Sequence, residues 1–414
     1  MNKALQKINK NGFWENAYLL VLGIYIAIDV LNTTMFKIQW PEKIGYIQYA
    51  IIGGYGLAKF IYCIKKKLYS MWEIVLTVAI VVVFTIVAVI TTSYSYLFPI
   101  AFLIIGAKDV DFDKILKVYI IVAITIILAA VLACQIGLLE NLRYVDHRGT
   151  RNSMGIIYPT DFGAHIFYLA LAWICYRNEK ITWCELFIIC IIAIIVYYLS
   201  MPVTSTACII LMLILSAFEK AYRKIEKNIV LRKIRGCFLQ AGKYSVIFFS
   251  AIYMFVQHMY NPESLFWHNV DDKISYRLMY TWYTLYDKTA KWFGQDIMEI
   301  GYGGNEDTSH DYMFLDDSYI SILMKYGIIV FALVLLIFII GQYKALKNQR
   351  FMIILAGITL SLHSIMEHHF LEIGYNPFVL IIFASFINEN RERNLNYENR
   401  NLHQHKRSDK RMCS

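Results

Sequence analysis

The sequence predicts an all-α integral membrane protein, and three observations support that fold class. Hydrophobic residues fill 58% of the 414 positions, while charged residues fill only 17%. A soluble chain of this length cannot bury so much apolar surface, whereas a lipid bilayer can cover it. The other two observations are a series of long apolar runs and an uneven distribution of basic residues between them.

The apolar runs are long enough to cross a bilayer, because a membrane-spanning helix needs about 20 apolar residues. They predict about twelve such helices, of which the fourth, eighth and eleventh are short. In chain order the predicted spans cover residues 16–36, 44–62, 72–92, 94–107, 115–136, 156–176, 182–200, 203–218, 243–259, 319–341, 351–366 and 373–387.

The basic residues predict the orientation of these spans. If the N-terminus is cytoplasmic, the cytoplasmic segments are 1–15, 63–70, 108–114, 177–181, 219–242, 342–350 and 388–414. These segments and their flanks hold about 30 of the 40 lysines and arginines, as the positive-inside rule requires. We therefore expect both termini to be cytoplasmic and the protein to be a multi-pass protein of a bacterial plasma membrane.

The chain divides into a polytopic membrane domain, residues 1–387, and a tail, residues 388–414. The tail is polar and basic, and it is predicted to be disordered. The longest water-facing segment is an outer loop over 260–318, between the ninth and tenth spans. In this loop apolar residues recur at helical spacing over 272–293, which predicts an amphipathic helix at the membrane surface.

The formal net charge of +9 does not indicate nucleic acid as a partner. Most basic residues are expected where anionic lipid headgroups would meet them, so membrane lipids explain the charge. None of the eight cysteines lies in the outer loop, and no CxxC zinc pattern exists. We therefore expect neither structural disulfides nor a cysteine-bound metal.

Three arginines lie in the predicted outer loop between the fifth and sixth spans, against the positive-inside rule. Guanidinium groups bind phosphate oxygens in bidentate fashion, so Arg143, Arg148 and Arg151 could form a diphosphate clamp. The alternative is a loop whose arginines reach lipid headgroups or pair with Glu140 and Asp146. Arg277, at the start of the amphipathic helix, is either a further phosphate ligand or a solvated surface residue.

Two clusters of ionisable residues are candidates for acid–base chemistry. His310, Asp311, Asp316 and Asp317 precede the tenth span, where a carboxylate or histidine could accept a proton from a sugar hydroxyl. The alternative is an ordinary acidic loop. The second cluster lies at the end of the eleventh span and contains His363, Glu367, His368, His369 and Glu372.

Ionisable groups at membrane depth usually face a cavity or a charged partner, and Asp29 in the first span is a lesser candidate of the same kind. A metal site around His363 and Glu367 is conceivable, but the pattern is weak and shows none of the outer hydrogen-bond partners that metal-binding histidines usually have. We therefore expect no metal and no cofactor.

Four segments together resemble the Wzy-type bacterial polysaccharide polymerases, which are related to the O-antigen ligases. RNSMGIIYPTDFG (151–163) resembles the R-x-S-x-G segment of that family, and RLMYTWYTLYDKTAKWFG (277–294) resembles its loop segment. DDSYISILMKYGI (316–328) and the pairing of Glu367 with YNPF (375–378) resemble its closing helices. The two aspartates stand where many ligases have His-Asn, and they fit the polymerases better.

This resemblance implies a glycosyltransferase that joins undecaprenyl-pyrophosphate-linked oligosaccharide repeat units on the outer face of the membrane, making capsular or exopolysaccharide. It implies diphosphate binding by Arg143, Arg148, Arg151 and Arg277, with Asp316, Asp317, His310 and Glu367 as catalytic candidates. A flippase and a chain-length regulator are the protein partners of such an enzyme. The alternatives are an O-antigen ligase-like glycan transferase, a transporter of the lipid-linked unit, and a structural membrane scaffold.

Overall fold

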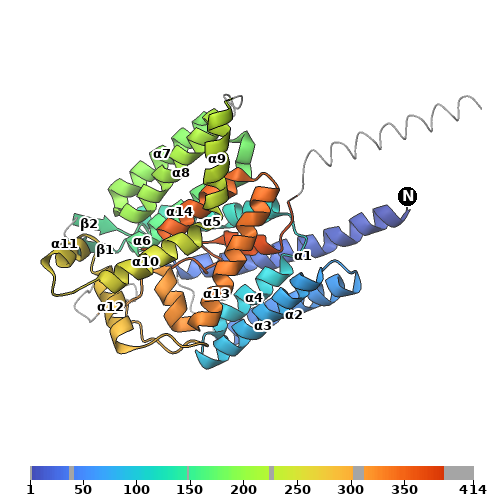
Figure 1. The fold of residues 1–414 in the computed structure, drawn as a ribbon, viewed down its shortest axis with the longest axis horizontal. Coiled ribbons are helices and arrows are strands. Elements are labelled where there is room, and N and C mark those ends of the chain that lie inside the picture. Colours follow the sequence, from blue (N-terminus) through green and yellow to red (C-terminus); the bar gives the residue numbers. More distant parts are fainter. Residues whose placement is uncertain (1, 37–41, 147–148, 223–227, 302–311, 387–414) are drawn as a thin grey trace, which may run out of the picture.

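The computed structural model describes residues 2–36, 42–146, 149–222, 228–301 and 312–386. It shows packed helices around one apolar core, with a short β-hairpin on the flank (Figure 1). The elements are α1 Asn2–Asn32, α2 Glu42–Lys65, α3 Met71–Ile90, α4 Tyr94–Gly106, α5 Phe112–Gln135, β1 Arg143–Asp146, β2 Gly149–Asn152, α6 Pro159–Arg177, η1 Asn178–Lys180, α7 Trp183–Ser200, α8 Val203–Tyr222, α9 Ile229–Gly242, α10 Ser245–Met259, α11 Leu265–Lys273, α12 Arg277–Asp287, α13 Ser318–Lys347, α14 Phe351–His363 and η2 Pro377–Ile382.

The helices form two lateral groups joined by a central one. On one side α2 and α3 pack against α4, and on the other α7 and α8 pack together, with α9 close by (Figure 1). Between them lie α5, α6, α13 and α14. One end of the assembly carries the β-hairpin, α11, α12 and the segments 312–317 and 364–376, and we call it the loop face.

By length and composition, seven helices in the described part of the chain could cross a membrane. They are the apolar parts of α1, α2, α3, α5, α7, α8 and α13, with an eighth if α9 and α10, bent by 64°, count as one span. The chain is therefore a multi-pass, mostly helical membrane protein. The predicted count of about twelve is not reached in the described residues: α4 and α14 have only 13 residues each, where a bilayer requires about 20, and the 19-residue α6 is not among the counted helices.

The last predicted span, 373–387, is wrong as a membrane helix. Its described part contains only the 3-10 helix η2, which begins at Pro377 after the Asn376 side chain accepts a hydrogen bond from the Phe378 amide. Residues 378–384 are buried inside the protein, and the backbone beyond them bonds to the α4–α5 junction through Asp109, Val110 and Phe112. The run is apolar because it fills the core, and apolarity alone does not distinguish core from lipid contact.

The outer loop also differs from the prediction. Instead of one helix over 272–293, it contains α11 and α12, separated by Ser275 and Tyr276 in the left-handed conformation. Non-glycine residues rarely adopt that conformation, and here it separates the end of α11 from the start of α12. The amphipathic helix that remains is α12, which begins at Arg277.

A glycine contact connects this loop to α13. The helix is broken at Gly327, whose φ is 90°, and the amides of Ile328 and Ile329 bond to the carbonyls of Lys291 and Trp292. A Cβ atom on Gly294 would lie 2.2 Å from the Lys325 carbonyl oxygen, and one on Gly327 would lie 2.2 Å from the Gly294 amide. Only glycine at both positions allows the two backbones to approach this closely.

Candidate functional site

The best-defined polar site lies on the loop face, where Arg277 contacts two acidic side chains from other segments. Its Nε lies 3.2 Å from Asp316 Oδ2, and its Nη1 lies 3.3 Å from Glu367 Oε1. Nη1 also donates to the Met366 carbonyl oxygen. All three side chains are largely buried, with exposed fractions of 14%, 17% and 5% for Arg277, Asp316 and Glu367. The structure thus brings together three residues that lie 39 to 90 positions apart.

Arg277 is positioned by an aspartate at the end of α11. The carboxylate of Asp271 accepts hydrogen bonds from the amides of Leu278 and Met279 at 2.8 and 2.9 Å, and from the Tyr260 hydroxyl at 2.9 Å. These bonds satisfy amides of the first turn of α12, which have no partner within the helix. The start of α12, and with it Arg277, is therefore fixed relative to α10 and α11.

The two predicted aspartates have different environments. Asp317 caps α13, since its carboxylate accepts from the Ile320 amide at 2.6 Å and lies 3.2 Å from the Thr281 hydroxyl. Burial raises its pKa to about 7. Burial also raises the pKa of Asp316 and of Glu367 above their ordinary values, although the nearby Arg277 lowers both. Of the two aspartates, Asp316 is the one whose carboxylate faces Arg277.

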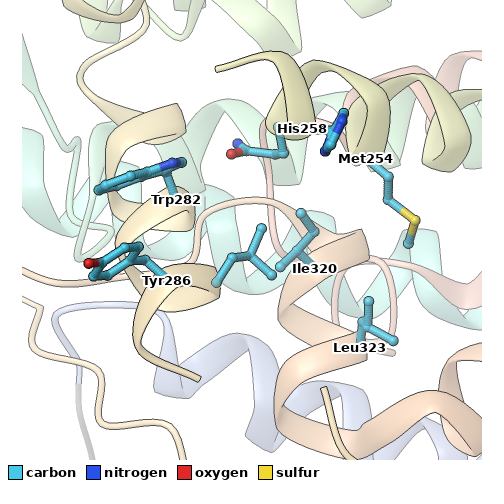
Figure 2. Close-up of a pocket in the computed structure, with 8 residues that line it drawn as sticks. Met254, His258, Trp282, Tyr286, Ile320 and Leu323 are labelled. Atoms are coloured by element: carbon cyan, nitrogen blue, oxygen red, sulfur yellow. The ribbon is translucent and has the colours of Figure 1, made fainter. Parts of the chain in front are cut away.

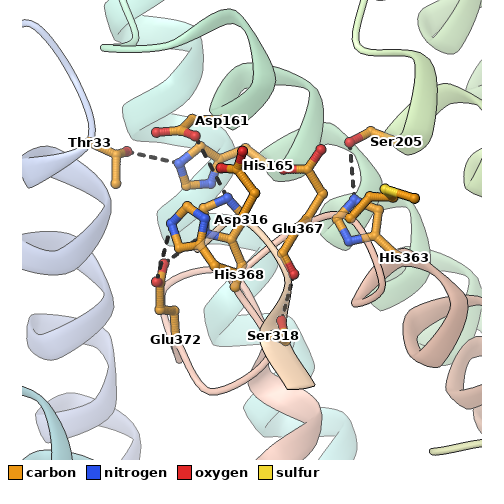
Figure 3. A network of polar contacts seen from close by, with 12 residues as sticks. Thr33, Asp161, His165, Ser205, Asp316, Ser318, His363, Glu367, His368 and Glu372 are labelled. Carbon is orange, nitrogen blue, oxygen red and sulfur yellow. Dashed lines mark hydrogen bonds and ion pairs between the residues drawn. The ribbon is translucent and has the colours of Figure 1, made fainter. Parts of the chain in front are cut away.

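The segment 364–376, which joins α14 to η2, carries most of the remaining ionisable groups (Figure 3). His369 Nδ1 lies 2.8 Å from Glu372 Oε2, and His369 Nε2 lies 3.7 Å from Asp161 Oδ1. Burial lowers the pKa of His369, but the two carboxylates outweigh it and raise the value to about 10. The pKa of the neighbouring His368 falls well below its ordinary value because burial is not offset.

Neither Asp161 nor Asp29 was predicted to lie beside the 364–376 segment, although both side chains contact it. Asp161, in the first turn of α6, lies one helical turn before His165, and this i, i+4 spacing is the signal that could have identified it. Asp29, a lesser candidate in the sequence, accepts from the Gly374 amide at 2.9 Å and so fixes the 364–376 segment against α1. His363 points elsewhere, with its Nε2 3.1 Å from the Ser205 hydroxyl (Figure 3).

The hairpin arginines do not converge in the described residues. In the register of β1 and β2, Arg143 lies opposite Asn152, and Tyr144 lies opposite Arg151. Because successive residues of a strand point to opposite faces, Arg143 and Arg151 lie on opposite faces of the hairpin. Arg151 is buried and donates through Nε to the Ser200 carbonyl at the end of α7. Arg148, His310 and Asp311 lie outside the described residues.

An open cavity of about 450 Å³ lies beside α12, between α10 and α13 (Figure 2). Its lining is mainly apolar and aromatic, and the rings of Trp282 and Tyr286 stack at 5.1 Å. Gln257, which lines it, starts a hydrogen-bonded chain through Tyr253 and Thr281 to Asp317, with steps of 3.1, 3.3 and 3.2 Å. The cavity is thus connected to the acidic pair that precedes α13.

Comparison with known proteins identified no relative of this chain. No family model matches the chain, and neither a curated protein nor a solved structure matches it.

Proposed function

We propose that the protein is a membrane glycosyltransferase that polymerises undecaprenyl-pyrophosphate-linked oligosaccharide repeats on the outer face of the bacterial plasma membrane. The observation that carries the proposal is the buried contact of Arg277 with Asp316 and Glu367. These three residues lie in three of the segments that resemble the Wzy-type polymerases. A cation beside carboxylates of raised pKa is what a transfer with a diphosphate leaving group requires.

In this reaction Asp316 is the general base. The acceptor hydroxyl gives its proton to Asp316 while its oxygen forms a bond to the anomeric carbon of the donor. The bond between that carbon and the diphosphate oxygen breaks, and undecaprenyl pyrophosphate leaves with the electron pair. No external energy source is needed, since the diphosphate ester bond is consumed.

Arg277 stabilises the leaving diphosphate. In the resting structure its charge is shared between Asp316 and Glu367. When Asp316 takes the proton, its attraction for the guanidinium falls, and Arg277 becomes available to the charge that develops on the leaving group. Glu367 still contacts the guanidinium and keeps the arginine in place.

The remaining features have secondary roles in this proposal. The cavity beside α12 is lined mainly by apolar side chains and offers space for the lipid part of a substrate along the helix that begins with Arg277. Asp317 is engaged as the cap of α13, which leaves Asp316 as the better base.

A cell-based assay tests the proposal. A strain that makes the lipid-linked repeat but lacks its polymerase is complemented with wild-type or variant protein, and the glycans are separated by gel electrophoresis. Arg277→Ala and Asp316→Asn should reduce long-chain polymer by about a hundredfold or more, the loss seen when one transition-state charge contact is removed. Lys291→Ala is the matched control, because Lys291 is an exposed cation of the same loop. Undiminished polymer with Arg277→Ala at normal protein levels would refute the assignment.

A transporter of the lipid-linked unit is the second candidate, and one observation favours it. His165 is fully buried on α6 and bonds to the Thr33 hydroxyl at 2.8 Å. Ionisable groups within helices are common in transport pathways. Vesicles with labelled lipid-linked repeat distinguish the two candidates: a transporter moves the label across the bilayer, whereas the polymerase extends it.

A further inference from the structure

Three metal-binding side chains of the 364–376 segment come together around one point, and the proposed transfer reaction does not use them. His368, His369 and Glu372 each offer a ligand atom, and these atoms lie within 4.8 Å of one another. Glu372 Oε2 lies 2.8 Å from His369 Nδ1, and Glu372 Oε1 lies 3.7 Å from His368 Nε2. The carboxylate thus reaches both imidazoles from a position one turn farther along the chain.

These distances fit a small tetrahedral metal ion. Zinc binds histidine nitrogen and carboxylate oxygen at about 2.0–2.2 Å, so two ligand atoms of one tetrahedron lie about 3.4 Å apart. The two contacts of Glu372, at 2.8 and 3.7 Å, lie on either side of that value. The three ligand atoms lie within 4.8 Å of one another, so binding an ion would draw them together by up to about 1.4 Å.

The two imidazoles are held in place by other aromatic rings. Tyr375 stacks between His165 and His369, with ring centroids 3.9 and 3.8 Å away. His368 meets the edge of Phe314 at 4.9 Å. A binding site whose ligands are fixed before the ion arrives loses little conformational freedom on binding.

A carboxylate stands behind one of these imidazoles. Asp161 Oδ1 lies 3.7 Å from His369 Nε2, a nitrogen that is buried and makes no hydrogen bond. Histidines that bind a metal through one ring nitrogen typically direct the other toward a carboxylate or carbonyl, which fixes the tautomer. Asp161 is in position to do this when Nδ1 faces the ion.

We propose that His368, His369 and Glu372 bind one divalent ion of the zinc class, with Asp161 as the outer partner of His369. Two imidazoles and one carboxylate favour such an ion over Mg²⁺ or Ca²⁺, which prefer oxygen ligands. Three protein ligands leave a fourth coordination position for water or a substrate oxygen. The site does not depend on the proposed transfer reaction, because metal binding can be measured without activity.

Metal stoichiometry tests this site directly. The full-length protein, purified in detergent with any affinity tag removed, is stripped with a chelator, incubated with Zn²⁺, freed of excess metal by gel filtration and analysed by mass spectrometry. We expect about one zinc per chain for the wild type and almost none for Glu372→Gln or His368→Ala. His258→Ala, which changes an exposed histidine of α10, should retain the wild-type amount.

Two further measurements make the result specific. His403 and His405 in the C-terminal tail could bind zinc on their own, so every protein is also made with both replaced by alanine, and the stoichiometries should not change. Co²⁺ in place of Zn²⁺ should give the strong visible absorption of a tetrahedral site, and Asp161→Asn should weaken binding by about 10- to 100-fold.

Two results would overturn the proposal. One is a wild-type protein that retains no zinc after gel filtration while it elutes as a folded species. The other is an equal amount of zinc in wild type and Glu372→Gln. Either would mean that His369 only shares a proton with its two carboxylates.

Discussion

Charged side chains are arranged differently at the two ends of this protein. At the end where α5, α7 and α14 begin, four of the described cations each pair with one carboxylate, and two of these pairs are partly exposed. Arg350 pairs with Asp113, and Arg235 makes two bonds of 2.7 and 2.6 Å to Glu219. Lys114 and Arg177 pair with Glu15 and Glu185 at 2.6 and 2.7 Å.

At the loop face the charges are not matched. Among the described residues, and apart from the carboxylates that cap helices and the Lys325–Glu299 pair, the network of Arg277 and His369 contains five carboxylates: Asp29, Asp161, Asp316, Glu367 and Glu372. Arg277 and His369 each contact two of them. A matched pair needs nothing more from its surroundings, whereas an excess of buried carboxylates favours protons, cations or a cationic ligand. The matched end therefore fastens helices together, and the unmatched end is where we expect chemistry.

The largest effect should come from removing the shared cation. Arg277→Met leaves both Asp316 and Glu367 buried without compensation, and it should lower the free energy of unfolding by about 3–5 kcal/mol. Adding Asp316→Asn alone should restore only part of the loss, because Glu367 remains. Thermal unfolding of the purified variants measures this loss. If Asp316→Asn restores all of the lost stability, Arg277 pairs with Asp316 alone and Glu367 does not share its charge.

A smaller effect is expected at the matched end. Arg350→Met should lower the free energy of unfolding by about 2 kcal/mol, because the Asp113 side chain is 30% exposed and water can replace part of the lost contact. The double variant Arg350→Met with Asp113→Asn should recover most of that stability. The same unfolding assay applies, and a double variant less stable than the single one would contradict the matched-pair description.

The smallest effect concerns pH. Asp317 has a folded-state pKa of about 7, above its ordinary value of 3.8. Its stabilising contribution is therefore complete below pH 3.8 and is lost as the pH rises through 7. Between pH 5 and pH 8 the wild type should lose more thermal stability than Asp317→Asn, since asparagine still caps the helix and does not ionise.

Asp287→Asn serves as the control for this comparison, because Asp287 is an exposed carboxylate at the end of α12. It should follow the wild type across the same pH range. If Asp317→Asn does so too, ionisation of Asp317 does not contribute to the stability of the folded protein.

Local sequence predicted the helices better than it predicted the site. Apolar runs identified eleven of the helices, because hydropathy depends only on neighbouring residues. Hydropathy gave a wrong span at 373–387, where an equally apolar run fills the protein core.

The site depends on contacts between distant segments, which spacing cannot show. Arg277, Asp316 and Glu367 were each candidates, but nothing local indicated that they would meet. The reverse holds for Arg143 and Arg151, which are close in sequence but separate because a hairpin alternates its faces. Glu372 returns to His368 and His369 only because Asp29 and Tyr375 hold the 364–376 segment in place.

The most direct test of the central claim is polymerisation in vitro by the purified protein alone. Wild-type protein is mixed with a lipid-linked repeat unit, and the product is separated by gel electrophoresis. The account predicts a ladder of products that grows by whole repeats, made by the wild type and by Lys291→Ala but not by Arg277→Ala. A ladder from Arg277→Ala at the wild-type rate, or none from folded wild-type protein, would contradict it.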